Sequence, residues 1–418
     1  MRHQPAVDYG AGSAQETKTD PFSICLVHRE LRLNGLGGGV STYHKNIAEA
    51  LFLRGLSPCI LARKDVGDDR DCAPVVKGAT VTMLENRNFR SSIAGIRSLT
   101  PSVNWLIHSI RVALHLRRLS KETGLDIVET PDNAAECLLF ALVKKNVRLV
   151  IRPQYPSFMY DGIEKTRKFS PNGILFWWLE RMQLLLADEI ICSSRSLRDM
   201  VADGFGIARS RIRVIPLPVE IPDIGPLSEL RFPHPTVLYA GKLSIHKGVR
   251  CLVDAFQEVQ RGVPDVRFVF VGRGVKELAA YVSQQLPGAL ERDQIEIRDA
   301  VPRSELFDLY RRAQVCAFPS LVEPFGYTCA EAMAVGACVI GSKGTGHEDL
   351  VEDGESGFLV EPGNVRALAE TIIRALTDEG LRLRIGQAAG HRIRTCFSAD
   401  RVAAEQVKVY QSLLACRS

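Results

Sequence analysis

The sequence predicts an α/β protein made of two doubly wound parallel sheets that face each other across a cleft. Short apolar runs alternate with longer segments of helical periodicity along most of the chain. Strand, helix, strand in repeated order is typical of a parallel sheet covered on both faces. Between the two series, segment 215–222 (IPLPVEIP) contains three prolines, which continue neither a helix nor a central strand. This segment therefore predicts a hinge, with the ligand site in the cleft between the halves.

The first predicted domain spans residues 21–218 and follows a leader at 1–20. The leader has no apolar core, so it does not resemble a secretory signal. Helices are predicted between the strands, for example over 41–54 and 132–143. The predicted strands are 22–27, 58–62, 126–129, 147–151, 189–192 and 213–215.

The second predicted domain spans residues 219–397 and repeats the same alternation. A final helical segment occupies 398–418, with its periodic part at 398–416. The two halves share a pattern but no tandem sequence repeat. The predicted strands are 237–240, 267–271, 295–297, 315–318 and 339–341.

Composition excludes several classes of protein. The 418 residues are 46% hydrophobic and 24% charged, the balance of an ordinary globular chain. No apolar stretch reaches the roughly 18 residues that a membrane span needs. The eleven cysteines include no Cys-x-x-Cys pair, which predicts reduced thiols in the cytoplasm and no zinc site. A net charge of +5 permits anionic ligands but does not favour nucleic acid.

Two loops have the composition of phosphate-binding segments. A glycine-rich turn at 35–41 includes Gly38 and Gly39, and it follows the first strand and opens a helix, whose free amides suit a phosphate. The alternative is a flexible turn. Later, Lys242 and Lys247 lie in a glycine-bounded loop at a strand end and are spaced to neutralise a diphosphate. The alternative is two solvated lysines.

The strongest signal is the segment 323–336 (EPFGYTCAEAMAVG). Glu323 lies in a Pro/Gly loop after a strand, and Glu331 lies eight residues on, in the next helix. The helix start exposes the amides from Phe325 through Gly326 and Tyr327 to Thr328, and the two carboxylates can accept hydrogen bonds from sugar hydroxyls. The alternative, two glutamates that only cap and solubilise a helix, explains less of this context.

Together with the segment 353–359 (DGESGFL), these motifs occur in the order found in retaining glycosyltransferases of the GT-B fold. The chain resembles family 4, also called group 1, from about residue 22 to 416. The resemblance implies two Rossmann-like domains, with acceptor binding in the first and nucleotide-sugar binding in the second. It also implies a C-terminal helix that crosses back to the first domain.

The resemblance also implies a role for each matching residue. Glu331 would bind the nucleotide ribose, and Glu323 would lie beside the transferred sugar. Lys242 and Lys247 would neutralise the diphosphate without a metal or other cofactor. The phosphates and sugar would be enclosed by the helix-start amides and by Gly38 and Gly39. The base pocket would be bordered by segment 271–274, which contains Gly272 and Gly274.

Two positions depart from the family pattern. Lys242 stands where the family usually has arginine, so a planar fork is replaced by one ammonium. Gln154 stands at the nearest match to a histidine that typically contacts the reacting sugar. Gln154 can form hydrogen bonds but cannot titrate. A front-face retaining mechanism tolerates this change, because the departing phosphate oxygen can take the acceptor's proton.

The resemblance implies a metal-independent retaining hexosyltransferase. It would move a sugar from a UDP- or GDP-linked donor onto a glycan or lipid-linked saccharide, as in polysaccharide or lipopolysaccharide biosynthesis. Two alternatives stay open: a small-molecule glycoside or sugar-phosphate synthase, and a non-catalytic scaffold that binds sugar nucleotides.

A basic amphipathic segment at 90–121 suggests contact with an anionic membrane surface, which would place the protein at the inner face of the cell membrane. The alternative is a domain-covering helix with solvated arginines. The adjacent aromatics Phe176, Trp177 and Trp178 predict a helix core with one exposed ring, or else a sugar platform.

Overall fold

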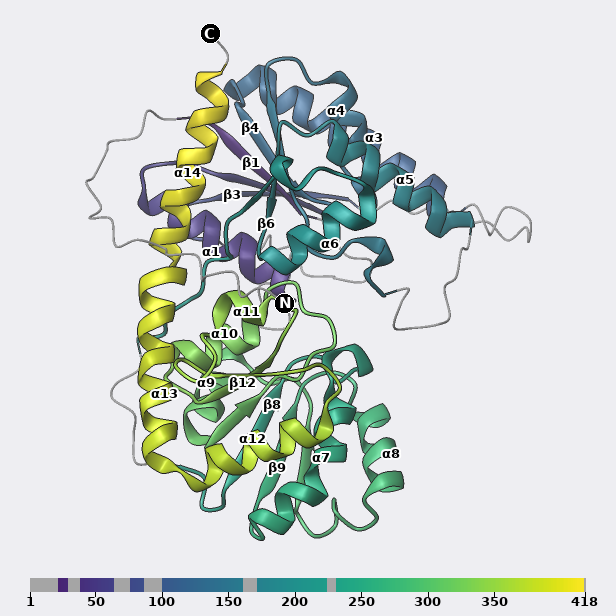
Figure 1. The fold of residues 1–418 in the computed structure, drawn as a ribbon. Helices are drawn as coiled ribbons and strands as arrows, with labels where there is room; N and C mark the ends of the chain where they lie inside the picture. The colour runs from purple at the N-terminus through teal and green to yellow at the C-terminus, as the bar shows by residue number, and fades with distance from the viewer. Residues whose placement is uncertain are drawn as a thin grey trace.

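The computed structural model contains two parallel sheets, one above the other in Figure 1, with helices on both faces of each. The structure describes residues 22–28, 38–63, 76–85, 100–160, 171–223 and 231–416. The predicted leader and the start of the basic segment, 90–99, lie outside these residues. This architecture confirms the predicted fold class of two Rossmann-like domains.

The first sheet has the strand order β3-β2-β1-β4-β5-β6-β7, and all its pairings are parallel. The strand numbering reverses direction at β1, between β2 and β4. Ligands of doubly wound sheets bind beyond the carboxyl ends of strands at such a point. The elements are β1 Ile24–His28, α1 Gly39–Leu53, β2 Cys59–Arg63, β3 Thr80–Leu84, α3 Thr100–Thr123, β4 Ile127–Pro131, α4 Leu138–Val143, β5 Arg148–Arg152, α5 Pro171–Leu185, β6 Glu189–Cys192, α6 Arg195–Phe205 and β7 Ile212–Val214.

The second sheet has the order β10-β9-β8-β11-β12-β13 and is also parallel. Its elements and the closing helices are β8 Thr236–Ala240, α7 Val249–Gly262, β9 Arg267–Val271, α8 Val275–Gln285, β10 Ile295–Arg298, α9 Arg303–Arg312, β11 Val315–Ala317, α10 Tyr327–Ala334, β12 Val339–Ser342, α11 His347–Leu350, β13 Phe358–Val360, α12 Val365–Thr377, α13 Glu379–Arg392 and α14 Ala399–Ala415.

The structure differs from the predicted elements in three places. The strands β3 and β13 were not predicted, because each is a short edge strand without a long apolar run. The predicted helix at 132–143 is wrong in its first part, since α4 begins only at Leu138. Ala134 and Ala135 have positive φ angles there. The carboxylate of Glu180 holds this turn by accepting a hydrogen bond from the Ala134 amide (3.2 Å).

The C-terminal helix α14 returns to the first domain, where it packs beside α1 (Figure 1). A buried polar cluster fixes it there. Gln406 and Tyr410 of α14 donate to Oε2 of Glu129 on β4 (2.8 and 2.6 Å), and Oε1 of Glu129 pairs with the buried Arg152 on β5 (3.2 Å). Buried charges are retained where they are paired and hydrogen-bonded in this way. Within the described residues, no helix is long and apolar enough to cross a membrane.

The chain passes between the domains twice, and the two passages lie side by side. The Val219 amide donates to the Phe397 carbonyl (2.9 Å), and Val219 and Ser398 form an isolated parallel bridge. The first sheet ends at Val214 and the second begins at Thr236, so the change of sheet spans the predicted hinge at 215–222.

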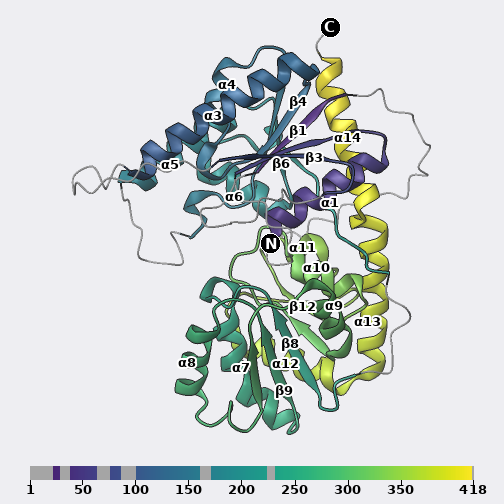
Figure 2. The same cartoon turned by 180° about the vertical axis from the view of Figure 1, so that it is seen from behind.

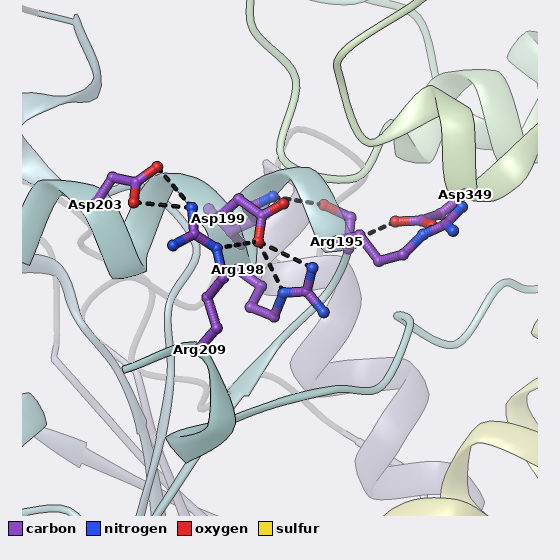
Figure 3. A network of polar contacts seen from close by, with 8 residues as sticks. Arg195, Arg198, Asp199, Asp203, Arg209 and Asp349 are labelled. Atoms are coloured by element: carbon purple, nitrogen blue, oxygen red, sulfur yellow. Dashed lines mark hydrogen bonds and ion pairs between the residues drawn. The ribbon is translucent and has the colours of Figure 1, made fainter. Parts of the chain in front are cut away.

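Direct polar contacts also join the two domains. At the start of α6, Arg195 donates from its backbone and its Nε atom to the carboxylate of Asp349 (2.6 and 2.5 Å; Figure 3). Ser194 caps the same helix and donates its hydroxyl to the Pro324 carbonyl (2.6 Å). These contacts hold α11 and the loop after β11 against the first domain.

Candidate functional site

A cleft of about 940 Å³ lies between the domains and is lined by both. Its walls are built from segments that follow β5 in the first domain and β8, β9, β10 and β11 in the second, together with the start of α1. The carboxyl ends of both sheets therefore meet there, as expected for doubly wound folds. Every predicted site residue lines the cleft except Gly274.

Gly274 and Gly272 shape the backbone behind the cleft. Gly274 is the N-cap of α8, with a φ of 108°, and a Cβ atom there would lie 2.7 Å from the Leu243 carbonyl oxygen. A Cβ atom on Gly272 would overlap the Gly241 carbonyl oxygen. Both positions need glycine because the loops after β8 and β9 approach so closely.

The loop after β11 is held by backbone contacts on both sides. The Leu321 amide donates to the His246 carbonyl (2.8 Å), and the Gly346 amide donates to the Glu323 carbonyl (2.7 Å). Gly326 caps α10 with a φ of 101°, and a Cβ atom there would lie 2.5 Å from the ring of His347. Since His347 is buried, burial lowers its pKa to about 4 and leaves it neutral. The residues at the start of α10 thus line the cleft beside a neutral ring.

Lys247 and Glu323 form a buried ion pair in the second domain, with 2.7 Å between Nζ and Oε2. Burial alone would raise the pKa of Glu323, but the charge and hydrogen bond of Lys247, with smaller contributions from His347 and Ser320, together hold that pKa below its usual value. Burial opposes the charge of Lys247 in turn, and the attraction of Glu323 raises the pKa of the lysine. Each charge is therefore stabilised by the other.

Lys242 lies in a different environment from Lys247. Its side chain is exposed at the cleft, and the structure pairs it with no carboxylate in the described segments. The backbone carbonyl of Lys242 accepts a hydrogen bond from the Tyr239 hydroxyl (2.9 Å), which holds the main chain of the loop in place. The sequence analysis predicted the same role for both lysines. In the structure, Lys247 is paired with Glu323, whereas the side chain of Lys242 is exposed to solvent.

Glu331 is paired with Arg303, a cleft residue that the sequence analysis missed. Nη2 of Arg303 lies 2.7 Å from Oε1 of Glu331. Burial raises the pKa of Glu331, and Arg303 offsets this effect only in part. Nη1 of Arg303 lies 3.5 Å from Glu220 in the hinge segment, and Lys45 of α1 lies 3.7 Å from the same oxygen. Alternating charges thus connect Glu331 to the first domain.

On the first domain's side, Gln154 is buried but faces the cleft. Its backbone amide donates to Oδ1 of Asp132 (2.9 Å), and its Nε2 atom has no hydrogen-bond partner among the described residues. Burial raises the pKa of Asp132 to about 6. Burial and then the charge of Asp132 raise the pKa of Glu180 to about 7. Gln154 therefore lines the cleft with an Nε2 donor that is buried and unused.

The described part of the glycine-rich turn lies at the start of α1. Gly38 is its N-cap and Gly39 its first residue, and both line the cleft. A Cβ atom on Gly39 would approach the Tyr327 ring of the second domain to 3.1 Å. Gly35 and Gly37 lie outside the described residues.

Two residues of the cleft and of the contact between the domains, Arg303 and Asp349, were not predicted from the sequence. Arg303 follows Pro302 at the start of a helix after β10, and a helix start at that edge of a sheet faces the cleft. Asp349 directly follows Glu348, but the structure buries Asp349 and exposes Glu348. In the described residues, no group of three His, Cys, Asp or Glu side chains is arranged to hold a metal, and metal independence stays a prediction.

Two doubly wound domains that face each other across a charged cleft define the GT-B class of fold. Two family models match this chain, Glycosyltransferase Family 4 over residues 37–221 and Glycosyl transferases group 1 over residues 229–392. The chain belongs to the group 1, or family 4, glycosyltransferases.

Similar proteins agree with this family. The chain is 30% identical over 251 residues to the D-inositol 3-phosphate glycosyltransferase of Xylanimonas cellulosilytica, in an alignment that covers 55% of this chain and 58% of that protein. The fold matches sucrose-phosphate synthase from Thermosynechococcus elongatus, with a TM-score of 0.73 at 20% identity over 94% of this chain and all of the other. It also matches Anabaena HepE in complex with UDP and glucose, with a TM-score of 0.70 at 19% identity over the same shares.

Proposed function

We propose that this chain transfers a sugar from a nucleotide-diphosphate donor to a hydroxyl acceptor, with retention of configuration and without a metal. The observation that carries the proposal is the arrangement of the cleft wall. The buried pair Lys247–Glu323, the exposed Lys242 and the start of α10 all meet there. A cation and free amides on one wall suit an anionic leaving group.

In the proposed mechanism, the second domain binds the donor. Glu331 accepts hydrogen bonds from the ribose hydroxyls, with Arg303 keeping its carboxylate ionised. Gly272 and Gly274 keep the loops around the base in place. Lys242 and the amides of residues 326–328 hold the diphosphate. Lys247 contributes a second positive charge, and its ion pair orients Glu323 beside the sugar.

The transfer breaks the bond between the anomeric carbon and the diphosphate oxygen as the sugar becomes oxocarbenium-like. The acceptor oxygen forms the new bond on the same face, and its proton passes to the departing phosphate oxygen. Gln154 donates from Nε2 to a sugar or acceptor hydroxyl. Gly38, Gly39 and the interdomain contacts of α6 help to exclude water from the closed cleft.

The acceptor we favour is a glycan or lipid-linked saccharide, met by a cytoplasmic protein at the inner membrane face. A small-molecule acceptor is the second candidate, and the name of the Xylanimonas relative, an inositol-phosphate glycosyltransferase, supports it. The UDP and glucose of the HepE complex favour a UDP-linked donor.

The test is thermal melting with UDP, GDP, ADP and CDP and their sugar conjugates, followed by transfer assays with the base that binds. A donor at about 100 times its Kd adds about 2.7 kcal/mol of stability. We expect a shift that Glu331→Ala abolishes and that the exposed control Glu355→Ala retains. NMR of the product then reports retention. No shift with any nucleotide overturns the proposal, and a shift without turnover on any acceptor makes the chain a non-catalytic binder.

A further inference from the structure

The exposed large apolar side chains gather on one side of the first domain. Of the fifteen among the described residues, ten lie on three helices, α3, α4 and α5. Scattered exposed apolar residues are normal on a soluble protein, but a gathered set marks a contact surface. The ten are Leu106, Ile110, Leu114, Leu142, Val143, Ile174, Leu175, Trp178, Met182 and Leu185.

On α3 and α5, the helical spacing of these residues places them in a row on the solvent-facing side of the helix, called a stripe below. On α3 they recur every four residues, at 106, 110 and 114, while Val112, Ala113 and Leu116 face the sheet. On α5 they recur at 174, 178, 182 and 185, while Gln183 and Leu184 are buried. Residues three and four apart share one face of a helix. Each helix therefore has one apolar face on the core and a second one in solvent.

The three helices are neighbours and form a single surface. They cover the face of the first sheet opposite α1 and α14, and both views place them away from the C-terminal helix (Figures 1 and 2). Trp178, whose predicted exposed ring is confirmed at 50% exposure, lies on this surface and is not among the residues that line the cleft. This placement argues against a sugar platform.

Most of the exposed charges on this surface are positive. The stripe on α3 continues from Leu114 into Arg117, Arg118 and Lys121, and Lys145 follows α4. On α5, the Arg181 guanidinium lies 5.6 Å from the centre of a Trp178 ring. The exposed acid on the described faces of these helices is Glu122, and Arg118 pairs with it (2.7 Å). Apolar stripes flanked by cations match the interface of an anionic lipid leaflet.

We propose that the face formed by α3, α4 and α5 docks on a bilayer containing anionic lipid, with the apolar stripes at the acyl boundary and the arginines and lysines at the headgroup phosphates. A second copy of the chain fits less well. A symmetric pair would bring the same basic faces together, and like charges would oppose it.

This docking deepens the proposed function, because it places the cleft at the surface where a lipid-linked acceptor is found. The biological role of the docking rests on the proposed function, but lipid binding itself can be measured without donor or acceptor. A failure of either can therefore be distinguished from a failure of the other.

The test is flotation of the full chain with vesicles of phosphatidylcholine alone and of an equal mixture with phosphatidylglycerol. We expect flotation with the mixture and much less with phosphatidylcholine alone. Leu114→Gln/Trp178→Gln should lower the partition coefficient about tenfold or more, and Arg117→Gln/Lys121→Gln should lower it and weaken its salt dependence.

Matched controls replace exposed residues of the same kind elsewhere. Leu53→Gln/Leu383→Gln and Arg261→Gln/Lys276→Gln should float like the wild type. All variants change exposed side chains, and unchanged melting temperatures will show that they fold. Wild-type protein that floats with neither vesicle overturns the proposal, as does equal flotation of both docking-face variants. A dimer that Leu114→Gln/Trp178→Gln dissociates, in protein that does not float, assigns the face to self-association instead.

Discussion

Buried acids lie on both sides of the cleft, and the two domains treat them differently. In the second domain, Glu323 is paired with Lys247, and this pairing together with smaller neighbouring contributions offsets burial and lowers the pKa of the acid. In the first domain, Asp132 accepts a backbone hydrogen bond, no cation among the described residues pairs with it, and burial raises its pKa to about 6. The buried acid of the second wall is therefore compensated by a cation, and the exposed Lys242 adds a positive charge that suits an anionic donor. The first wall keeps the uncompensated Asp132 behind Gln154, whose side-chain amide suits hydroxyls.

The largest effect is expected from breaking the compensated pair. Lys247→Met leaves Glu323 buried without its cation, which should cost about 3 kcal/mol of unfolding free energy. Sugar transfer should fall by about a hundredfold or more, because a charge beneath the leaving group is lost. Urea unfolding and steady-state kinetics measure the two effects.

A double variant separates stability from catalysis. Lys247→Met/Glu323→Leu removes both charges and should recover most of the stability, since two apolar side chains replace a buried pair at little cost. Its transfer activity should stay low. Recovery of activity together with stability would show that the pair has only a structural role.

The next effect concerns Arg303. Arg303→Met removes the cation that offsets burial at Glu331, so the pKa of that carboxylate should rise further. Nucleotide affinity should fall about tenfold near neutral pH and recover as the pH is raised, because a protonated Glu331 accepts ribose hydrogen bonds poorly. Calorimetric titration of the nucleotide at a series of pH values measures it. Arg303→Lys should restore the affinity, and a loss that is independent of pH would contradict the assignment.

The sequence predicted the second-domain wall of the cleft better than the first-domain wall. Glu323, Glu331 and Lys247 lie in contiguous motifs at strand ends, and parallel strands bring such ends together. Arg303 was missed because its partner Glu331 lies 28 residues along the chain. The positive φ angles of Ala134 and Ala135 were missed for a similar reason, since the acid that holds the turn comes from α5. Tertiary contacts of this kind leave no local pattern.

A moderate effect is expected from Gln154. Gln154→Ala removes the unused Nε2 donor from the first wall. Turnover should fall about tenfold, the range of one neutral hydrogen bond made in the transition state. The melting shift produced by the nucleotide should match the wild type, because the donor binds the other wall. An altered nucleotide shift with normal turnover would reverse this division of the walls.

The smallest effect concerns the uncompensated acids. The folded-state pKa values of Asp132 and Glu180, about 6 and about 7, lie above their unfolded values because burial disfavours their charged forms. The stability that they contribute is present below the unfolded pKa values and is lost as the pH rises through the folded ones. Asp132→Asn keeps the acceptor for the Gln154 amide and removes one of these charges. It should make the variant more stable than the wild type by roughly 1 kcal/mol near pH 8, with little difference near pH 4, at the unfolded pKa. Urea unfolding at the two pH values measures this difference. An equal fall in stability with pH for both proteins would mean that the first wall compensates its acids as the second wall does.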